Sequence, residues 1–160
     1  MKNHCAAIGY PIGVNKLKDG SIVFCIELQN RIAYVTLDEL SGWARISRHD
    51  IDDSISTELI ASLKKKGVVV WCNNQGTFEQ RLQGYTPIRQ GYSVIDDKGN
   101  LVVYLGNAKH LLTPLQFQLW ICADGNVTLS TCLSGLNYCG TESWTDAICV
   151  LIRKELIYLR

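Results

Sequence analysis

The sequence has no marked excess of either charge: 16 lysines and arginines stand against 15 aspartates and glutamates, a formal net charge of +1. DNA-binding domains more often carry a clear basic excess, so the composition offers no global attraction to nucleic acid, although a balanced total can hide a local basic patch. No stretch approaches the ~20 apolar residues of a membrane span. Residues 1–7 also lack the apolar run of a signal peptide. We therefore expect a soluble, cytoplasmic protein with no membrane partner.

Zinc-ribbon and redox motifs are also missing. The chain has seven cysteines, but no pair has the Cys-x-x-Cys spacing of such sites. Cys25 and Cys149 lie inside apolar runs, where a free thiol packs as a small hydrophobic group. We predict reduced packing cysteines and no metal site.

No catalytic constellation is recognisable. His4, His49 and His110 are widely spaced, and none lies in a motif with a nucleophile or paired carboxylates. The Gly-rich phosphate loops Gly-x-x-x-x-Gly-Lys-Ser/Thr and Gly-x-Gly-x-x-Gly do not occur. Residues 49–53 (His-Asp-Ile-Asp-Asp) could bind a cation by composition, but a solvated acidic loop explains them better, and Cys139 has no identifiable base. We predict a protein that is not an enzyme and needs no cofactor.

What the sequence does contain is an internal repeat, the kind of signal that defines an architecture. Gly-Tyr-Pro-Ile at residues 9–12 matches Gly-Tyr-Thr-Pro-Ile at 84–88, and the turn and apolar run at 18–26 match 97–105. Two further matches follow in the same order: residues 36–43 with 113–120, at an offset of 77, and residues 63–69 with 151–157, at an offset of 88. Four ordered matches favour duplication over chance.

Both copies predict the start of a helix at a threonine. Thr36 is followed three residues later by Glu39, and Thr113 by Gln116. This is the capping-box pattern, in which the hydroxyl and the later side chain satisfy the free amides of the first turn. Pro114 then occupies the first helical position, where its missing N–H costs nothing.

Around these helix starts, each copy predicts a three-stranded meander, two or three helices and a short closing strand. Turn glycines separate the strands, and the longer second offset leaves room for an extra middle helix at 127–136, with Thr128 as its cap. The other expected elements are third strands at 32–35 and 109–112, last helices at 55–66 and 142–154, and closing strands at 68–71 and 156–159.

We therefore predict an α+β fold of two tandem winged-helix-like units. The first unit spans residues 1–72 and has a shortened middle segment at 47–53. Residues 73–83 are polar, carry Gly76 and read as a linker. The second, complete unit spans residues 84–160.

The second copy resembles the PqqD-like family, the peptide-recognition domains of ribosomal peptide modification systems. The residues that carry the resemblance are the hairpin at 97–105, the helix entry at Leu112 and Thr113, Trp120, and the turn at 124–128. The duplication, the shortened first copy and the Gly-Tyr-Pro-Ile segment depart from that family. The resemblance implies that a peptide is bound as an added strand along the third strand, against the last helix.

This resemblance places a peptide- or protein-binding surface on the second copy. A free sheet edge has to be paired within the fold, covered by another element or bound by a partner. Aromatic side chains are favoured anchors of such interfaces. We predict a non-enzymatic adaptor or recognition module for a peptide or protein. The predicted binding residues are Lys109, His110, Trp144 and Lys154.

Two alternatives stay open. A winged-helix DNA-binding regulator would use the basic residues at the ends of the last helices, although recognition helices usually read bases from their N-terminal half and cations in a final turn also complement the helix dipole. The other alternative is a structural or assembly component of a larger complex. The predicted nucleic-acid-binding residues are Lys64, Lys65, Lys66, Arg153 and Lys154.

Overall fold

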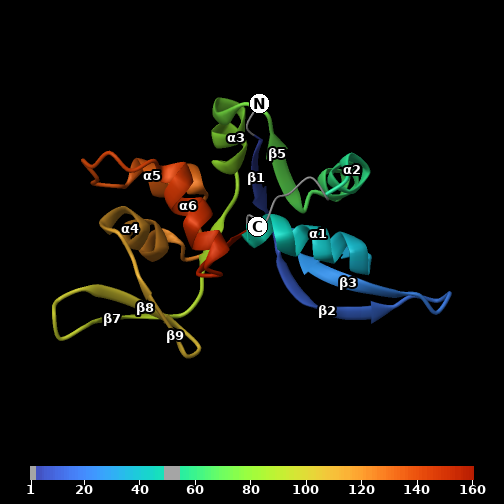
Figure 1. Ribbon diagram of the computed structural model, residues 1–160, viewed down its shortest axis with the longest axis horizontal. Coiled ribbons are helices and arrows are strands. Elements are labelled where there is room, and N and C mark those ends of the chain that lie inside the picture. Colours follow the sequence, from blue (N-terminus) through green and yellow to red (C-terminus); the bar gives the residue numbers. More distant parts are fainter. Residues whose placement is uncertain (1–2, 49–54) are drawn as a thin grey trace. The chain divides into compact units, whose positions relative to one another are not determined.

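The computed structural model describes residues 3–48 and 55–160 and has the predicted α+β fold (Figure 1). The chain divides into two compact units. Unit 1 comprises Met1–Tyr85 and Leu159–Arg160, and unit 2 comprises Thr86–Tyr158. Two tandem copies are compatible with this division. None of the helices within the described ranges combines the length and the apolar character of a bilayer span.

Unit 1 contains two small antiparallel sheets and three helices. A first strand at the start of the chain pairs with the strand that follows the second helix, and three consecutive strands form a meander. The strands are β1 (His4–Ala7), β2 (Tyr10–Lys16), β3 (Ile22–Glu27), β4 (Ile32–Val35) and β5 (Val69–Cys72). The helices are α1 (Leu37–Arg48), α2 (Thr57–Lys66) and α3 (Gln75–Leu82).

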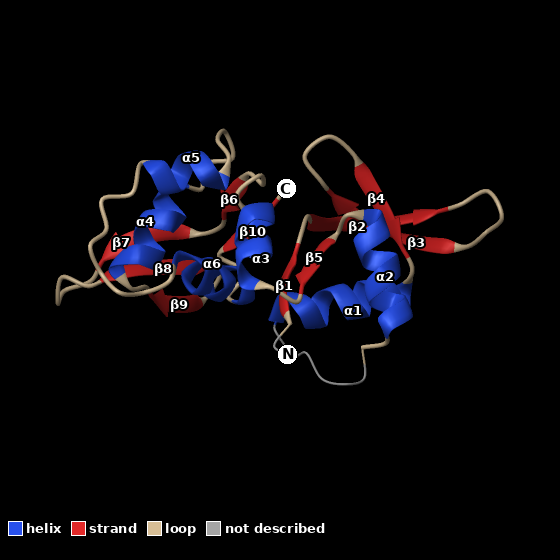
Figure 2. Ribbon diagram, turned by 90° about the horizontal axis from the view of Figure 1, so that it is seen from above, coloured by secondary structure: helices blue, strands red, loops and turns tan. Residues whose placement is uncertain are grey.

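The core of unit 1 lies between the meander and the helices. Ile26, Ala33 and Val35 are buried from β3 and β4, and Ile46 and Leu63 are buried from α1 and α2. Apolar burial of this kind stabilises a domain by roughly 25 cal/mol per Å². The hairpin of β2 and β3 extends beyond α1 in both views (Figures 1 and 2), and its outer strand is exposed throughout.

Unit 2 repeats this order of elements. Its first strand pairs with its last, three strands form a meander, and the predicted extra helix is present. The strands are β6 (Pro87–Arg89), β7 (Tyr92–Ile95), β8 (Leu101–Leu105), β9 (Ala108–Leu111) and β10 (Ile157–Leu159). The helices are α4 (Pro114–Cys122), α5 (Leu129–Ser134) and α6 (Trp144–Arg153). Thr128 caps α5 and Gly135 ends it, as the sequence predicts.

The predicted capping boxes are present in both units. The Thr36 N–H donates to Glu39 Oε2 at 2.7 Å, and the Glu39 N–H donates to Thr36 Oγ1 at 3.2 Å. Thr113 and Gln116 make the same reciprocal pair, at 3.3 Å and 3.2 Å. Both helix starts therefore satisfy amides that the helix itself leaves free.

A tryptophan contact also recurs. In unit 1 the Trp43 Nε1–H donates to the carbonyl of Ile8, and in unit 2 the Trp120 Nε1–H donates to the carbonyl of Gln90, both at 3.0 Å. The amides of the same two acceptor residues donate in turn to the chain just after α2 and just after α6. These pairs are Ile8 N to Val68 O and Gln90 N to Leu156 O, both at 2.8 Å. Each tryptophan thus connects the first helix of its unit to the residue that follows the opening strand.

The structure corrects the prediction of a linker. Residues 75–82 form α3, which Asn74 caps by accepting a hydrogen bond from the Thr77 N–H. Phe78 and Leu82 are buried at i and i+4, and α3 contacts β1 and β5. The segment is polar because its other faces are exposed, and this apolar pair gives it one buried face.

The match of the Gly-Tyr segments also needs correction. Gly9 and Gly91, not Gly84, occupy equivalent positions: each precedes the first meander strand and has positive φ, 90° and 82°. A Cβ at Gly9 would lie 2.7 Å from the carbonyl oxygen of Glu27, and one at Gly91 would lie 2.2 Å from that of Tyr104. Both positions therefore require glycine. The shortened segment predicted at 47–53 lies largely outside the described residues.

The cysteines are free thiols. Five of them are buried, as predicted for packing residues, while Cys122 is partly exposed and Cys139 is exposed. The buried thiols are Cys5, Cys25, Cys72, Cys132 and Cys149.

Candidate functional site

Strand β9 is an edge of its sheet. Within the described residues it pairs with β8 and with no strand on its other side. Its hairpin turn has two residues, Gly106 and Asn107, so the closing pair Leu105 and Ala108 is expected to exchange hydrogen bonds. Because bonded and non-bonded pairs alternate in an antiparallel ladder, Lys109 points its N–H and C=O away from β8.

The main-chain N–H and C=O of Leu111, like those of Lys109, are expected to point away from β8. A contact of the Leu111 carbonyl supports this orientation. The Lys154 ammonium, just beyond α6, donates to the Leu111 carbonyl at 3.5 Å. A carbonyl bonded to β8 would not be directed toward that helix end. Of the four residues predicted for partner binding, the structure therefore brings Lys154 close to β9 at Leu111 and His110. Lys109, also on β9, forms an ion pair with Asp96 at 3.8 Å.

His110 lies on the opposite face of β9 from Lys109. Partial burial lowers the pKa of its imidazole, and the nearby Lys154 charge lowers it further. Both effects disfavour the imidazolium. The imidazole of His110 is therefore uncharged at neutral pH, and it lies partly buried beside the β9 edge.

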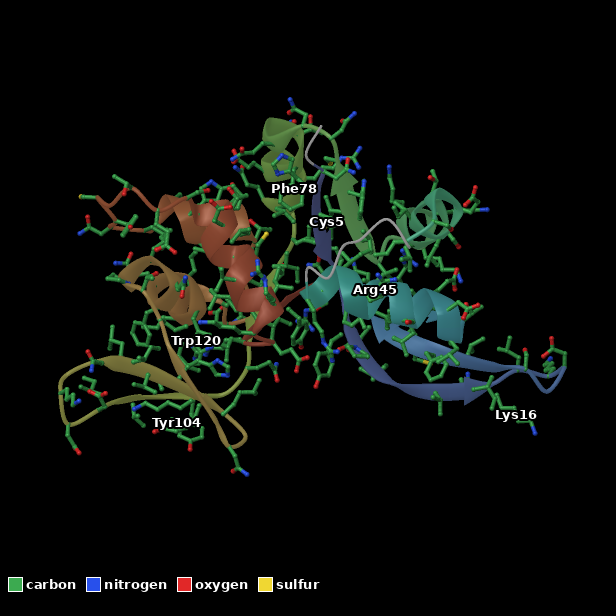
Figure 3. All side chains as sticks on the ribbon, in the orientation of Figure 1. Cys5, Lys16, Arg45, Phe78, Tyr104 and Trp120 are labelled. Atoms are coloured by element: carbon green, nitrogen blue, oxygen red, sulfur yellow. The ribbon has the colours of Figure 1, made fainter. Side chains whose placement is uncertain are left out.

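Several apolar side chains of the unit 2 meander, which contains Tyr104 (Figure 3), are exposed. The register places Tyr92, Tyr104 and Lys109 in one cross-strand row, and Val94, the fully buried Val102 and Leu111 in the next. The rings of Tyr92 and Tyr104 stack with centroids 5.6 Å apart. Tyr92 is 59% exposed and Leu111 is 60% exposed. The solvated face of an antiparallel sheet is ordinarily polar, so this face is unusually apolar beside a free edge.

Trp144 does not join this site. It is the first residue of α6, whereas Lys154 follows the last. The rise of an α-helix separates the two by about 15 Å along the axis. Of the predicted binding residues, the structure thus places His110 and Lys154 near the β9 edge and Trp144 at the other end of α6. The prediction did not include Tyr92, Val94 and Leu111, which are exposed.

The residues predicted for nucleic-acid binding have different surroundings. Lys66 forms an ion pair with Glu39 at 2.5 Å, and the Ser62 hydroxyl donates to the same carboxylate. Burial by itself raises the pKa of Glu39, but the hydrogen bonds from Lys66 and Ser62 outweigh it and leave that pKa below its usual value. Lys66 thus joins α1 to α2. Lys154 is likewise engaged with Leu111, while Arg153 is exposed.

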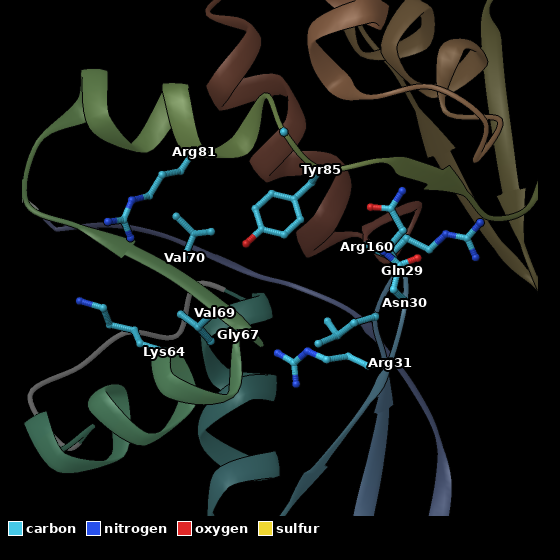
Figure 4. A pocket seen from close by; sticks show the side chains of 12 residues that line it. Gln29, Asn30, Arg31, Lys64, Gly67, Val69, Val70, Arg81, Tyr85 and Arg160 are labelled. Carbon is cyan, nitrogen blue, oxygen red and sulfur yellow. The ribbon is translucent and has the colours of Figure 1, made fainter.

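Lys64 and Lys65 are exposed at the end of α2, and only Lys64 lines a pocket in unit 1. The pocket has a volume of about 560 Å³ and lies between the β3–β4 turn, the α2–β5 junction and the end of α3 (Figure 4). Its cationic lining residues are Arg31, Lys64, Arg81 and Arg160. Sequence analysis found Lys64 but not the other three, because they are scattered along the chain.

No metal centre is found in the described residues. No group of three His, Cys, Asp or Glu side chains there could hold a metal ion. His4 packs its ring 5.8 Å from that of Phe78, and His110 is held beside Lys154. Residues 49–53, which could bind a cation by composition, lie outside the described part of the chain.

Comparison with protein-family models, with curated proteins and with solved structures gives no match for this chain. The PqqD-like resemblance therefore stays a prediction, and the functional argument rests on the geometry of the chain itself.

Proposed function

We propose that the protein is a non-enzymatic recognition module that binds a peptide or protein partner as an added strand on β9. The observation that carries this proposal is the edge of β9, where the main-chain groups of Lys109 face away from β8 and the Leu111 carbonyl accepts a hydrogen bond from Lys154. Strand addition takes its affinity from such main-chain hydrogen bonds.

Specificity would come from the outer face beside that edge. A bound strand places alternate side chains on the two faces of the sheet. On the outer face these would lie next to Leu111 and Lys109, with the stacked Tyr92 and Tyr104 beyond them. Apolar and aromatic partner side chains suit this surface, and contiguous exposed apolar patches commonly mark interaction sites.

A DNA-binding regulator is the weaker candidate. Lys66 and Lys154 are two of the five cations that it would use, and both already make contacts inside their own units. Duplex binding draws on many lysines and arginines that contact phosphates. An assembly component of a larger complex would also use the β9 edge, but with a folded partner. A cytoplasmic location belongs to the proposal, because free cysteines are typical of reducing compartments.

The test is to pan a phage-displayed library of random peptides on the protein and to measure the enriched peptides by isothermal titration calorimetry. Lys109→Pro removes an outward N–H from β9 and should weaken binding at least tenfold. Proline is tolerated on edge strands where the N–H faces solvent, so the circular dichroism spectrum should not change.

Ser93→Pro is the matched control. Val103 uses its main-chain groups toward His110, so the opposite residue of β7, Ser93, points its own N–H away from the sheet. This variant therefore carries the same change on the other edge, and it should bind like the wild type. Equal affinity in the wild type and in a folded Lys109→Pro variant would exclude strand addition at β9, as would failure to enrich any peptide.

A further inference from the structure

The basic residues of the unit 1 pocket come from four segments that are distant in sequence, the fourth of which contributes Arg160. The β3–β4 turn contributes Arg31, the last turn of α2 contributes Lys64, and the end of α3 contributes Arg81 and, just beyond, Tyr85. Figure 4 shows these side chains around one hollow. The two sheets and α3 position them, so the convergence of the cations is a property of the fold.

Arg31 is held in place by the end of α2. Its Nη2 donates to the carbonyl of Lys66, and it passes directly over Gly67, where a Cβ would lie 2.6 Å from the same nitrogen. Gly67 has positive φ, 71°, and ends the helix. This contact uses one of the five guanidinium N–H donors, so Arg31 keeps other donors for a ligand.

The charged side chains of the lining are all basic. Four lysine and arginine side chains contribute to it, and none of its described lining residues is acidic. A concave, partly apolar wall raises the attraction of such a group of charges for an anion. Here Val69, Val70 and the Tyr85 ring supply the apolar part. A monoanion would leave most of this charge uncompensated, so the pocket suits a compact ligand with several negative charges.

The charges of Arg81 and Arg31 both act on the hydroxyl of Tyr85. Its hydroxyl points into the space between Arg81 and Arg31 (Figure 4). Burial raises the pKa of this phenol, while the charges of Arg81 and Arg31 both lower it. The two guanidinium groups thus act on one point inside the pocket, where the hydroxyl can also donate a hydrogen bond to an anion.

We propose that this pocket binds a small phosphorylated ligand. Phosphate groups carry about two negative charges at neutral pH and match the planar fork of arginine bidentately. The volume of about 560 Å³ lies within the range of roughly 300–1,000 Å³ that is typical of small-molecule sites. Arg81 and Arg31 would hold phosphate oxygens, Lys64 would add a point charge, and Tyr85 would pack against an organic moiety.

A nucleic-acid backbone fits the same charges less well. Its phosphates are spaced along a strand and need a basic stripe on an open surface. Here the neighbouring Lys65 lies outside the pocket lining and Lys66 is paired with Glu39. The cations that remain converge on one concave site.

Isothermal titration calorimetry with inorganic pyrophosphate and with ADP tests the proposal. The full chain should bind at least one of these probes with a stoichiometry of one. Lys64→Gln and Arg81→Gln should each weaken binding at least tenfold. Lys65→Gln is the matched control: it removes the same charge from the adjacent exposed residue of α2, and it should leave the affinity within twofold. Circular dichroism should show that all three variants stay folded.

Four outcomes would overturn the proposal. The first is that neither probe binds at millimolar concentration. The second is that Lys65→Gln weakens binding as much as Lys64→Gln, which would indicate general charge attraction. The third is that citrate binds as tightly as pyrophosphate, which would remove the phosphate assignment. The fourth is that a 20-base-pair DNA duplex binds more tightly than ADP and displaces it, which would make the site part of a nucleic-acid surface.

Discussion

Gly67 and Glu155 follow α2 and α6 with the same left-handed backbone, at φ values of 71° and 58°. Each donates its N–H to the residue three positions back, at 3.0 Å and 2.9 Å, and the next residue donates to the residue five positions back. This double closure is the Schellman motif. The two units thus share one helix end, but only the first has the glycine that this conformation favours.

Replacing Glu155 with glycine should stabilise the protein. The left-handed conformation costs a residue with a Cβ about 1 kcal/mol or more, and glycine avoids that cost. We expect Glu155→Gly to raise the free energy of unfolding by about 1 kcal/mol, measured by urea denaturation. Glu155→Ala controls for loss of the side chain, because alanine keeps the strain. A gain of the same size in Glu155→Ala would show that the backbone is not the cause.

Thr113→Ala should destabilise unit 2. The Thr113 hydroxyl accepts from the Gln116 N–H at 3.2 Å and donates to the Glu142 carboxylate at 2.6 Å. Loss of an N-cap side chain costs about 1 kcal/mol, and the second contact adds to the loss. Thr113→Ser keeps the hydroxyl and should cost less than half as much. Equal thermal unfolding midpoints for the wild type and the alanine variant would contradict this role.

The Glu39 ion pair predicts a dependence of stability on pH. Hydrogen bonds to Lys66 and Ser62 outweigh burial and hold the pKa of Glu39 below its ordinary value of 4.5. A carboxylate with a lowered pKa in the folded state stabilises the fold above its unfolded pKa, and this contribution disappears as the pH falls through the folded pKa. The stabilisation is therefore complete near neutral pH and lost in acid.

Glu39→Gln isolates this effect, because glutamine does not titrate. At pH 7 we expect the variant to unfold about 2 kcal/mol more easily, the usual contribution of a charged hydrogen bond. The difference from the wild type should shrink steadily below pH 4.5 in urea titrations. Asp19 and Asp96 also have lowered pKa values, from hydrogen bonds to Ser21 and Asn100, but they are present in both proteins. A difference that is constant from pH 7 to pH 3 would contradict the role of the ion pair.

Local signals in the sequence predicted much of the fold. The caps at Thr36, Thr113 and Thr128 each depend on three or four neighbouring residues, so they can be predicted without knowledge of tertiary contacts. Strand β1 and helix α3 were missed for the opposite reason. The four residues of β1 pair with β5 across most of unit 1, and α3 has only Phe78 and Leu82 as a periodic signal.

Of the two candidate sites, one could be predicted from the sequence and the other could not. The edge position of Lys109 and the approach of Lys154 to β9 followed from the order of strands and helices, so reasoning from the sequence reached them. The basic pocket did not, because Arg31, Lys64 and Arg81 become neighbours only after the β3–β4 turn, α2 and α3 pack around one hollow. The sequence shows a cluster at residues 64–66, of which the fold uses one lysine in the pocket and another in an ion pair.

The cysteines should differ strongly in reactivity. Cys139 is exposed, whereas Cys149 is buried in α6. Burial, with a smaller contribution from Asp146, raises the pKa of the Cys149 thiol to about 11. Only the thiolate reacts with an alkylating agent, so Cys149 is both shielded and protonated at pH 8. We expect iodoacetamide to label Cys139 first, as measured by mass spectrometry of peptides from timed samples.

Two controls make this labelling experiment decisive. Cys139→Ser should remove the fast phase and leave the slow one unchanged. Unfolding in urea should make Cys149 react as fast as Cys139, because the barrier in the native protein is burial. Comparable labelling of both thiols in the folded protein would mean that Cys149 is not buried in α6.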